Sequence, residues 1–276
     1  AINSMGGTGL WDEEDGFYYD HLKVNDEVIP LKIRSLVGLV PLLSVQVLEN
    51  EIMDSLPDFT KRTEWFLRNR TELSENISCM HEAGDEIRRL LAVPSKDRLD
   101  RILKYLFDED EFLSEWGIRS LSKFHDKHPF SMDIDGQNFS VKYSPGESET
   151  PMFGGNSNWR GPIWMPMNYL IIESLERYYY FSGDTYEVEF PTGSGNFINL
   201  QQAATKIAQR LIKFFTLNND GMRPSMGSFK HFHKGEKWQD KVLFYEYFHA
   251  ETGEGLGASH QTGWTALILR LIKKYR

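Results

Sequence analysis

The chain has 276 residues and a formal net charge of −9, with 40% hydrophobic and 26% charged residues, proportions that are ordinary for a soluble globular protein. The negative charge argues against a nucleic-acid partner, and no apolar run approaches the ~20 residues that a membrane helix needs. Without an evident signal peptide, and with Cys79 as its single cysteine, the chain is expected to be cytoplasmic and to carry no disulfide, metal or cofactor.

The first part of the chain is expected to be helical. Residues 1–9 read as the end of a helix followed by glycine caps. The segment 36–53 is apolar nearly all round, which predicts a deeply buried helix with Pro41 in its first turn. Another helix is expected over 58–70, with Asp58 as its N-cap.

Four later segments show the same helical periodicity. The helix expected over 95–107 begins at Ser95 and places four apolar residues on one face: Leu99, Ile102, Leu103 and Leu106. Apolar residues also recur at helical spacing over 165–181 and over 199–217. A last helix is expected over 263–275, where Lys and Arg lie near the C-terminus as the helix dipole prefers.

One segment alternates like a pair of strands. Residues 130–143 read "FSMDIDGQNFSVKY", and the Asp135-Gly136 pair suits a tight hairpin turn. The predicted fold is therefore mainly α, with helices joined by long connections and a small β-hairpin. Such connections exceed the ~2–8 residues usual in compact bundles, so function is expected on the loops.

Aromatic residues are the conspicuous compositional bias. Seven Trp, twelve Tyr and eighteen Phe make up 13% of the chain. Core packing would absorb most of them, but several lie beside Gly, Pro, Asn and acids in predicted loops. This mixture is typical of sugar-binding sites, where aromatic faces stack on the C–H faces of a ring and carboxylates, amides and Arg bond the hydroxyls.

Two of these loops precede the last third of the chain. The loop 9–20 has four acids before Gly16 and then three consecutive aromatics, but it lacks the alternating ligands and late Glu of an EF-hand. The loop 153–170 contains Arg160 between two tryptophans, followed by Gly161-Pro162. Glycines let a backbone approach a ligand, and Arg can bond two oxygens at once, or it can pair with a neighbouring acid.

The third loop contains one carboxylate in an aromatic run. Glu246 lies within "FYEYF" (244–248), and a glycine-rich stretch then leads to Gln261 and Trp264. The segment is either a strand whose acid faces solvent or one wall of a site.

Five motifs in this order carry a family resemblance. They are "LWDEEDGFYYD" (10–20), "WGIRSLS" (116–122), "GGNSNWRGPIW" (154–164), "YEYFHAETGEG" (245–255) and "HQTGWTAL" (260–267). Together they resemble glycoside hydrolase family 63, the processing α-glucosidase family, and the first two look like its large bacterial glucosidase-like branch. The resemblance runs from about Gly9 to Tyr275 and implies an (α/α)6 toroid of helical hairpins.

The same resemblance implies an inverting hydrolysis, in which one carboxylic acid protonates the leaving oxygen and one carboxylate activates water. Matching "YEYFHAETG" to the family's "YENYDPxTG"-like stretch makes Glu246 the general base. Tyr247 replaces the family's Asn and His249 its Asp, so the substrate contacts there stay open. The residues expected to bind substrate are Asn158, Trp159, Arg160, Trp164, Gln261, Trp264, Trp11 and Asp12.

The general acid of this family lies on an earlier loop, N-terminal to the motif at 10–20. A complete toroid has twelve helices, whereas about six or seven are predicted here. We therefore expect residues 1–276 to be the C-terminal part of a single (α/α)6 catalytic domain, completed by an N-terminal part that carries the acid. Asp12, Asp15 and Glu115 remain in-chain candidates for the acid.

The expected function is hydrolysis of α-glucosidic bonds in oligosaccharides. One alternative is another (α/α)6 sugar hydrolase, trehalase-like or mannosylglycerate hydrolase-like, because a fold does not fix the substrate. The other is a non-catalytic carbohydrate-binding fragment, because half a site can bind a sugar without turning it over.

Overall fold

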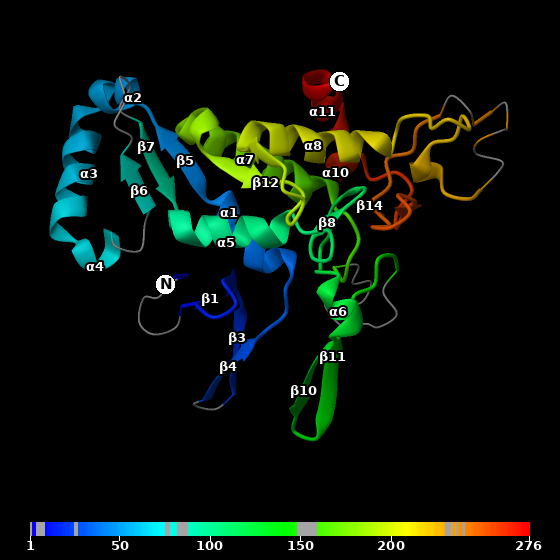
Figure 1. The fold of residues 1–276 in the computed structure, drawn as a ribbon, viewed down its shortest axis with the longest axis horizontal. Coiled ribbons are helices and arrows are strands. Elements are labelled where there is room, and N and C mark those ends of the chain that lie inside the picture. The colour runs from blue at the N-terminus through cyan, green and yellow to red at the C-terminus, as the bar shows by residue number, and fades with distance from the viewer. Residues whose placement is uncertain are drawn as a thin grey trace.

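A computed structural model describes residues 2–3, 9–24, 27–74, 78–81, 88–147, 159–229, 233, 235, 237–238 and 241–276. Across these ranges the chain is mainly helical, with short antiparallel hairpins between the helices (Figure 1). None of the helices in these ranges combines the length and the apolar character needed to span a bilayer. Most of the segment 1–9, including Gly6 and Gly7, and the candidate Asn158 lie outside the described residues.

Three helices pack together: α7 (Met165–Ser182), α8 (Leu200–Lys213) and α11 (Ile268–Tyr275). Helices α7 and α8 run side by side, and α11 packs against α8 (Figure 1). Helix α8 begins with a capping box, in which the Asn199 side chain accepts from the amide of Gln202 and the Gln202 side chain accepts from the amide of Asn199. The facing apolar residues of these helices belong to one continuous core.

The helix predicted over 95–107 is confirmed as α5 (Lys96–Leu106). Ser95 caps it by accepting from the amide of Arg98, and all four predicted core residues are buried. The helix predicted over 58–70 is confirmed as α3 (Pro57–Asn69), which is followed by α4 (Thr71–Ser74). The predicted N-cap of α3 was wrong: Leu56 is the N-cap, because Pro57 takes the first helical position that its fixed φ favours.

The single buried helix predicted over 36–53 was also wrong. The segment divides into η2 (Leu36–Leu39), α1 (Val40–Leu43), β5 (Val45–Leu48) and α2 (Asn50–Ser55). Pro41 does lie in the first turn of α1, but Ser44 leaves the helical region with φ −83° and ψ 71°. Val45 and Val47 then bury alternate side chains, and β5 pairs with β7 (Arg89–Ala92), which pairs with β6 (Ser78–His81). The buried side chains of this segment thus repeat every two residues, as in a strand, and not at the helical spacing.

The hairpin predicted over 130–143 is confirmed as β10 (Phe130–Ile134) and β11 (Gln137–Val141). Asp135 and Gly136 have φ values of 49° and 79°, as a tight hairpin turn requires. Further antiparallel pairs are present that the alternation did not predict. They are β1 (Trp11–Asp12) with β2 (Phe17–Tyr18), β3 (Asp20–Val24) with β4 (Glu27–Leu31), β8 (Leu113–Ser114) with β9 (Gly117–Ile118), β12 (Glu187–Glu189) with β13 (Phe197–Asn199), and β14 (Tyr247–Phe248) with β15 (Gly255–Leu256).

Two helices in the last third of the chain differ from the prediction. Helix α8 stops at Lys213 rather than at 217, and the helix predicted over 263–275 is divided into α10 (Thr262–Thr265) and α11. The remaining short elements are α6 (Phe124–Lys127), η3 (Gly183–Thr185) and η4 (Pro224–Met226).

Isolated backbone bridges connect segments that are distant in sequence. Ile163 bridges Arg119 on one side and Phe248 on the other, in antiparallel fashion. Asn168 of α7 reinforces this junction: its Oδ1 accepts from the amide of Ile118 at 2.7 Å, and its Nδ2 donates to the carbonyls of Ile118 and Trp164, both at 3.0 Å. The start of α7 is therefore fixed beside β9.

We expect Asn168→Ala to lower the free energy of unfolding by about 2–4 kcal/mol, because it leaves the buried amide and carbonyl of Ile118 without their partner. Asn199→Ala, which removes the cap of α8, serves as the control and should cost about 1 kcal/mol. Urea unfolding of both variants measures the difference. Equal losses would show that the Asn168 side chain does not hold the junction.

Candidate active site

Three predicted loop segments meet at the start of α7: residues 159–164, 244–248 and 261–264. Ile163 and Phe248 exchange backbone hydrogen bonds of 2.8 and 3.0 Å. The Thr265 hydroxyl donates to the carbonyl of Tyr245 at 2.5 Å, which attaches α10 to the same strand. The structure thus brings together motifs that are about 80 to 100 residues apart in sequence.

Four aromatic rings gather where these segments meet, and we call them the Trp164 cluster: Trp159, Trp164, Tyr247 and Trp264. The Trp164 ring lies parallel to Trp159 at 4.2 Å, and it is 5.0 Å from Tyr247 and 5.2 Å from Trp264. Trp164 and Tyr247 are buried, whereas Trp159 and Trp264 are each 38% exposed. The two exposed rings offer apolar faces to a ligand, supported from behind by buried rings.

Glu246 immediately precedes β14 and lies at the edge of this cluster. Its amide donates to the carbonyl of Ala258 at 2.9 Å, and its Oε2 accepts from the amide of Ala258 at 3.0 Å. The side chain is half-buried. One carboxylate oxygen is therefore fixed by the backbone, so Glu246 is not a freely solvated strand residue.

Gly257 forms a bulge opposite Glu246 and Tyr247. Its φ is +69°, a conformation that favours glycine. A Cβ at this position would lie 2.4 Å from Cε1 of Tyr247 and 2.8 Å from Oε2 of Glu246. The absence of a side chain at 257 thus leaves the space that the Glu246 carboxylate occupies.

Arg160 and Gln261 are the two predicted polar contacts in these segments. The Arg160 side chain is only 4% exposed, and burial lowers the pKa of its guanidinium. It therefore belongs to the interior of the wall rather than to an open surface. Gln261 is half-buried, and it is the N-cap of α10, one turn before Trp264.

Gly161 fixes the backbone next to Arg160. Its φ is +154°, and a Cβ there would lie 2.5 Å from the carbonyl oxygen of Ser144. Its amide donates to the Ser120 hydroxyl at 3.0 Å. The glycine therefore permits the close backbone approach that was expected of this loop, but the approaching group is Ser144.

Trp11 lies in a different cluster, against α5. Its ring is 4.8 Å from Tyr18, and the guanidinium groups of Arg98 and Arg101 lie 5.0 and 5.4 Å from it. The ring is 9% exposed. Its position is accounted for by packing and cation–π contacts within this cluster.

The in-chain candidates for a general acid are engaged in ion pairs. Lys32 lies 3.1 Å from Asp12 and 3.2 Å from Asp15, and Glu115 lies 3.8 Å from Lys213. Burial raises the pKa of Asp12, but the amide of Asp15 and the Lys32 ammonium outweigh it, and the pKa is lowered. A carboxyl with a lowered pKa is poorly suited to donate a proton near neutral pH.

A buried arginine that the sequence reasoning did not single out holds the other end of the Glu246 hairpin. Arg119 is 3% exposed and donates to Glu251 in the β14–β15 turn at 3.0 and 3.2 Å. The Tyr143 hydroxyl donates to the same oxygen at 2.6 Å. Arg119 also donates to three backbone carbonyls: those of Glu109, Glu111 and Leu113. Arg119 lies within the "WGIRSLS" motif (116–122), but its partner Glu251 is 132 positions away.

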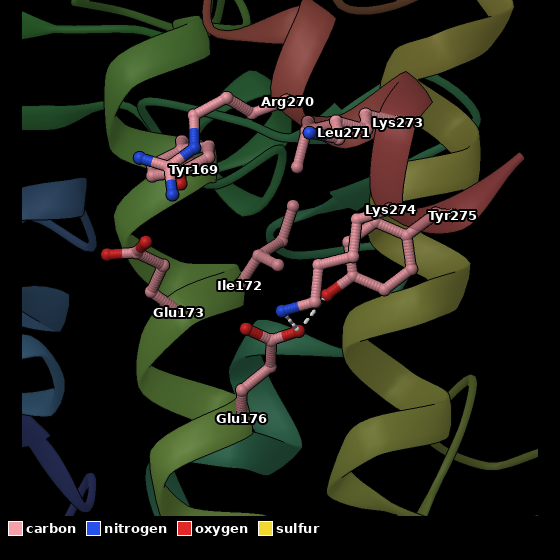
Figure 2. Close-up of a pocket in the computed structure, with 9 residues that line it drawn as sticks. All are labelled: Tyr169, Ile172, Glu173, Glu176, Arg270, Leu271, Lys273, Lys274 and Tyr275. Carbon is pink, nitrogen blue, oxygen red and sulfur yellow. Dashed lines mark hydrogen bonds and ion pairs between the residues drawn. The ribbon is translucent and has the colours of Figure 1, made fainter.

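A separate cavity of about 400 Å³ lies further along α7, between α7 and α11 (Figure 2). Two of its charged groups pair with each other: Lys274 lies 2.5 Å from Glu176, which also accepts from the Tyr275 hydroxyl. Arg270 lies over the ring of Tyr169. Among the described residues, no group of three or more His, Cys, Asp or Glu is arranged to hold a metal ion. The Trp164 cluster with Glu246 is therefore the candidate site.

Comparison with known proteins identifies related chains. The family model described as the mannosylglycerate hydrolase MGH1-like glycoside hydrolase domain matches residues 87–265. The uncharacterized protein YMR196W of Saccharomyces cerevisiae is 48% identical over 266 residues, which cover 95% of this chain and 24% of that protein. The mannosyl-oligosaccharide glucosidase of S. cerevisiae and a probable one of Schizosaccharomyces pombe are each 27% identical over 179 residues, covering 64% of this chain and 15% of each relative. The chain thus spans a quarter or less of these relatives.

We expect Glu251→Gln to lower the free energy of unfolding at pH 7 by about 1–3 kcal/mol, because the buried Arg119 loses its opposite charge. Burial raises the pKa of Glu251, but Tyr143 and Arg119 outweigh it and hold the pKa below the ordinary 4.5. The carboxylate's contribution is therefore full above about pH 4.5 and is lost as the pH falls through the lowered value.

Thermal unfolding from pH 7 down to pH 3 should show the gap between wild type and Glu251→Gln closing in acid. Glu64→Gln, in an exposed pair with Arg68 on α3, is the control and should change stability by less than about 1 kcal/mol. A gap for Glu251→Gln that stayed constant with pH would contradict the ion-pair interpretation.

Proposed function

The chain belongs to the mannosylglycerate hydrolase MGH1-like glycoside hydrolase family, and from this premise we propose that it forms part of the catalytic domain of a glycosidase acting on α-glucosidic bonds in oligosaccharides. Two relatives carry the name mannosyl-oligosaccharide glucosidase, which supports a glucosidic substrate. The chain spans 24% of one relative and 15% of two others, so the activity of the whole protein that carries this chain is itself part of the proposal.

The observation that carries the proposal is the position of Glu246 beside the Trp164 cluster. In the proposed reaction Glu246 is the general base: it takes a proton from a water molecule, which then attacks the anomeric carbon and inverts its configuration. One carboxylate oxygen accepts from Ala258, so the proton goes to the other. Trp159 and Trp264 stack against the sugar, and Arg160 and Gln261 shape the wall behind it.

An inverting site requires a second carboxyl about 6.5–9.5 Å from the base, to protonate the leaving oxygen. Asp12, Asp15 and Glu115 are all engaged by lysines. We therefore propose that the acid is supplied from outside these 276 residues, by another part of an (α/α)6 toroid to which α7, α8 and α11 belong. In this proposal Asn158 contributes to substrate binding, whereas Trp11 packs against α5 and Asp12 pairs with Lys32, so neither of these two residues is assigned to the site.

A second candidate substrate is mannosylglycerate, which the description of the family model favours. It differs from a gluco-oligosaccharide in carrying a carboxylate. Comparing hydrolysis of aryl α-glucosides, trehalose, short gluco-oligosaccharides and mannosylglycerate by the intact protein separates the two candidates.

We expect Glu246→Gln to lower kcat by about 10²–10⁴-fold in the intact protein that carries this chain, because Gln keeps the size of Glu but cannot accept the proton. KM should change much less, since the lost interaction belongs to the transition state. Steady-state kinetics on an aryl α-glucoside measures both, with Glu64→Gln as a control. A kcat close to wild type in Glu246→Gln would remove Glu246 from the mechanism.

Gly257→Ala tests whether the bulge positions the base. Gly195 has a similar φ of +73°, but a Cβ there would meet nothing within 4 Å. Both substitutions to Ala therefore introduce the same backbone strain, of about 1 kcal/mol or somewhat more. Gly257→Ala should additionally displace the Glu246 carboxylate and lower kcat at least tenfold. Equal kcat values in the two variants would show that the bulge plays no part in catalysis.

A further inference from the structure

A second carboxylate lies at the hydroxyl end of the Tyr247 ring. Glu147 follows β11 by six residues, and its Oε2 accepts a hydrogen bond from the Tyr247 hydroxyl at 2.7 Å. The backbone that carries it is fixed to the Glu246 hairpin, because the amide of Ala250 donates to the carbonyl of Pro145 at 2.9 Å. Glu147 itself is exposed.

Tyr247 physically links Glu147 to Glu246. Tyr247 and Glu246 both lie close to the position that a Cβ on Gly257 would occupy. Cε1 of Tyr247 is 2.4 Å from that position, and Oε2 of Glu246 is 2.8 Å from it. Together with the width of the ring and the bond to Glu147, these contacts keep the two carboxylates within about 10 Å of each other, the scale on which carboxyl groups flank one glycosyl unit.

The Tyr247 hydroxyl occupies only part of what Glu147 can accept. An ionised carboxylate has about four lone-pair positions, and Tyr247 uses one of them. Because Glu147 is exposed, its carboxylate is open to a ligand from the solvent side. No other described residue donates to the Glu147 carboxylate, so its remaining acceptor positions suit neutral donors such as sugar hydroxyls.

We propose that Glu147 is a specificity-determining residue, whose carboxylate accepts hydrogen bonds from hydroxyls of the glycosyl unit stacked on the Trp164 cluster. This inference rests on the proposed function. Tyr247 holds the Glu147 side chain toward the cluster, since the same ring also lies 5.0 Å from Trp164. With Glu246 nearby, a second negative charge favours neutral glycosyl units over anionic ones such as mannosylglycerate.

The test compares Glu147→Gln and Tyr247→Phe in the intact protein. With maltotriose as substrate, Glu147→Gln should raise KM roughly tenfold and change kcat less than about threefold, because ground-state and transition-state binding are lost together. Tyr247→Phe should raise KM by a smaller factor. The kcat/KM ratio of maltotriose to mannosylglycerate should fall in Glu147→Gln, because one repulsive charge is removed.

The chain offers a control with the same chemistry in a second tyrosine–glutamate contact, whose tyrosine is exposed whereas Tyr247 is buried. The Tyr180 hydroxyl donates to Glu49 at 2.7 Å, and this pair is exposed. Tyr180 lies on α7, sixteen residues after Trp164, which places it roughly 24 Å from Trp164 along the helix. Glu49→Gln and Tyr180→Phe remove the same chemistry away from the site. Both should leave KM unchanged, and their melting temperatures give the structural cost of such a pair.

Calorimetric titration of maltotriose into Glu246→Gln protein, with and without Glu147→Gln, separates this inference from the proposed function. Weaker binding in the double variant supports the role of Glu147, even if Glu246 proves not to be the base. Unchanged binding, or a KM for Glu147→Gln equal to that of Glu49→Gln, overturns it while the proposed function stands. A fall of 10² or more in kcat for Glu147→Gln also overturns it, because the residue would then act on the reacting bond.

Discussion

The candidate site depends on the backbone bridges of Ile163. This residue pairs with Phe248 on one side and with Arg119 on the other, so one short extended segment joins the loop of the base to β9. Backbone groups buried at such a junction must find partners, so the three segments pair in one register. That register sets the positions of Trp164, which follows Ile163, and of Glu246, which precedes β14. Asn168 then attaches α7 to the same junction.

Around this junction, glycines leave room for close contacts, and large aromatic rings fill the neighbouring space. Gly161 and Gly257 have positive φ values and stand where a Cβ would collide, with Ser144 in one case and with Tyr247 and Glu246 in the other. Trp164 and Tyr247 fill the interior beside them. Two partly exposed tryptophans and a half-buried carboxylate thus belong to segments that meet at the same junction.

Charge is distributed unequally on the two sides of the β14–β15 hairpin. In its turn, Glu251 neutralises the buried Arg119 and has a structural role. At its open end, Glu246 is bonded by one backbone amide, and Glu147 by one tyrosine hydroxyl. Carboxylates with remaining acceptor positions are those that can meet a hydroxylated ligand or a water molecule, and this contrast separates the proposed site from the ion pairs that only hold the fold.

The sequence by itself determined the features that depend on neighbouring residues. The Ser95 cap, the buried face of α5 and the Asp135-Gly136 turn follow from contacts within a few positions, and so could be predicted. Tertiary structure alone decided that 45–48 is a strand, because β7 supplies its hydrogen bonds, and that Trp11 packs against α5. It also brought Arg119 to Glu251 and Tyr247 to Glu147, across 132 and 100 positions. No local pattern encodes such contacts, since their energy arises only when the distant segments are packed together.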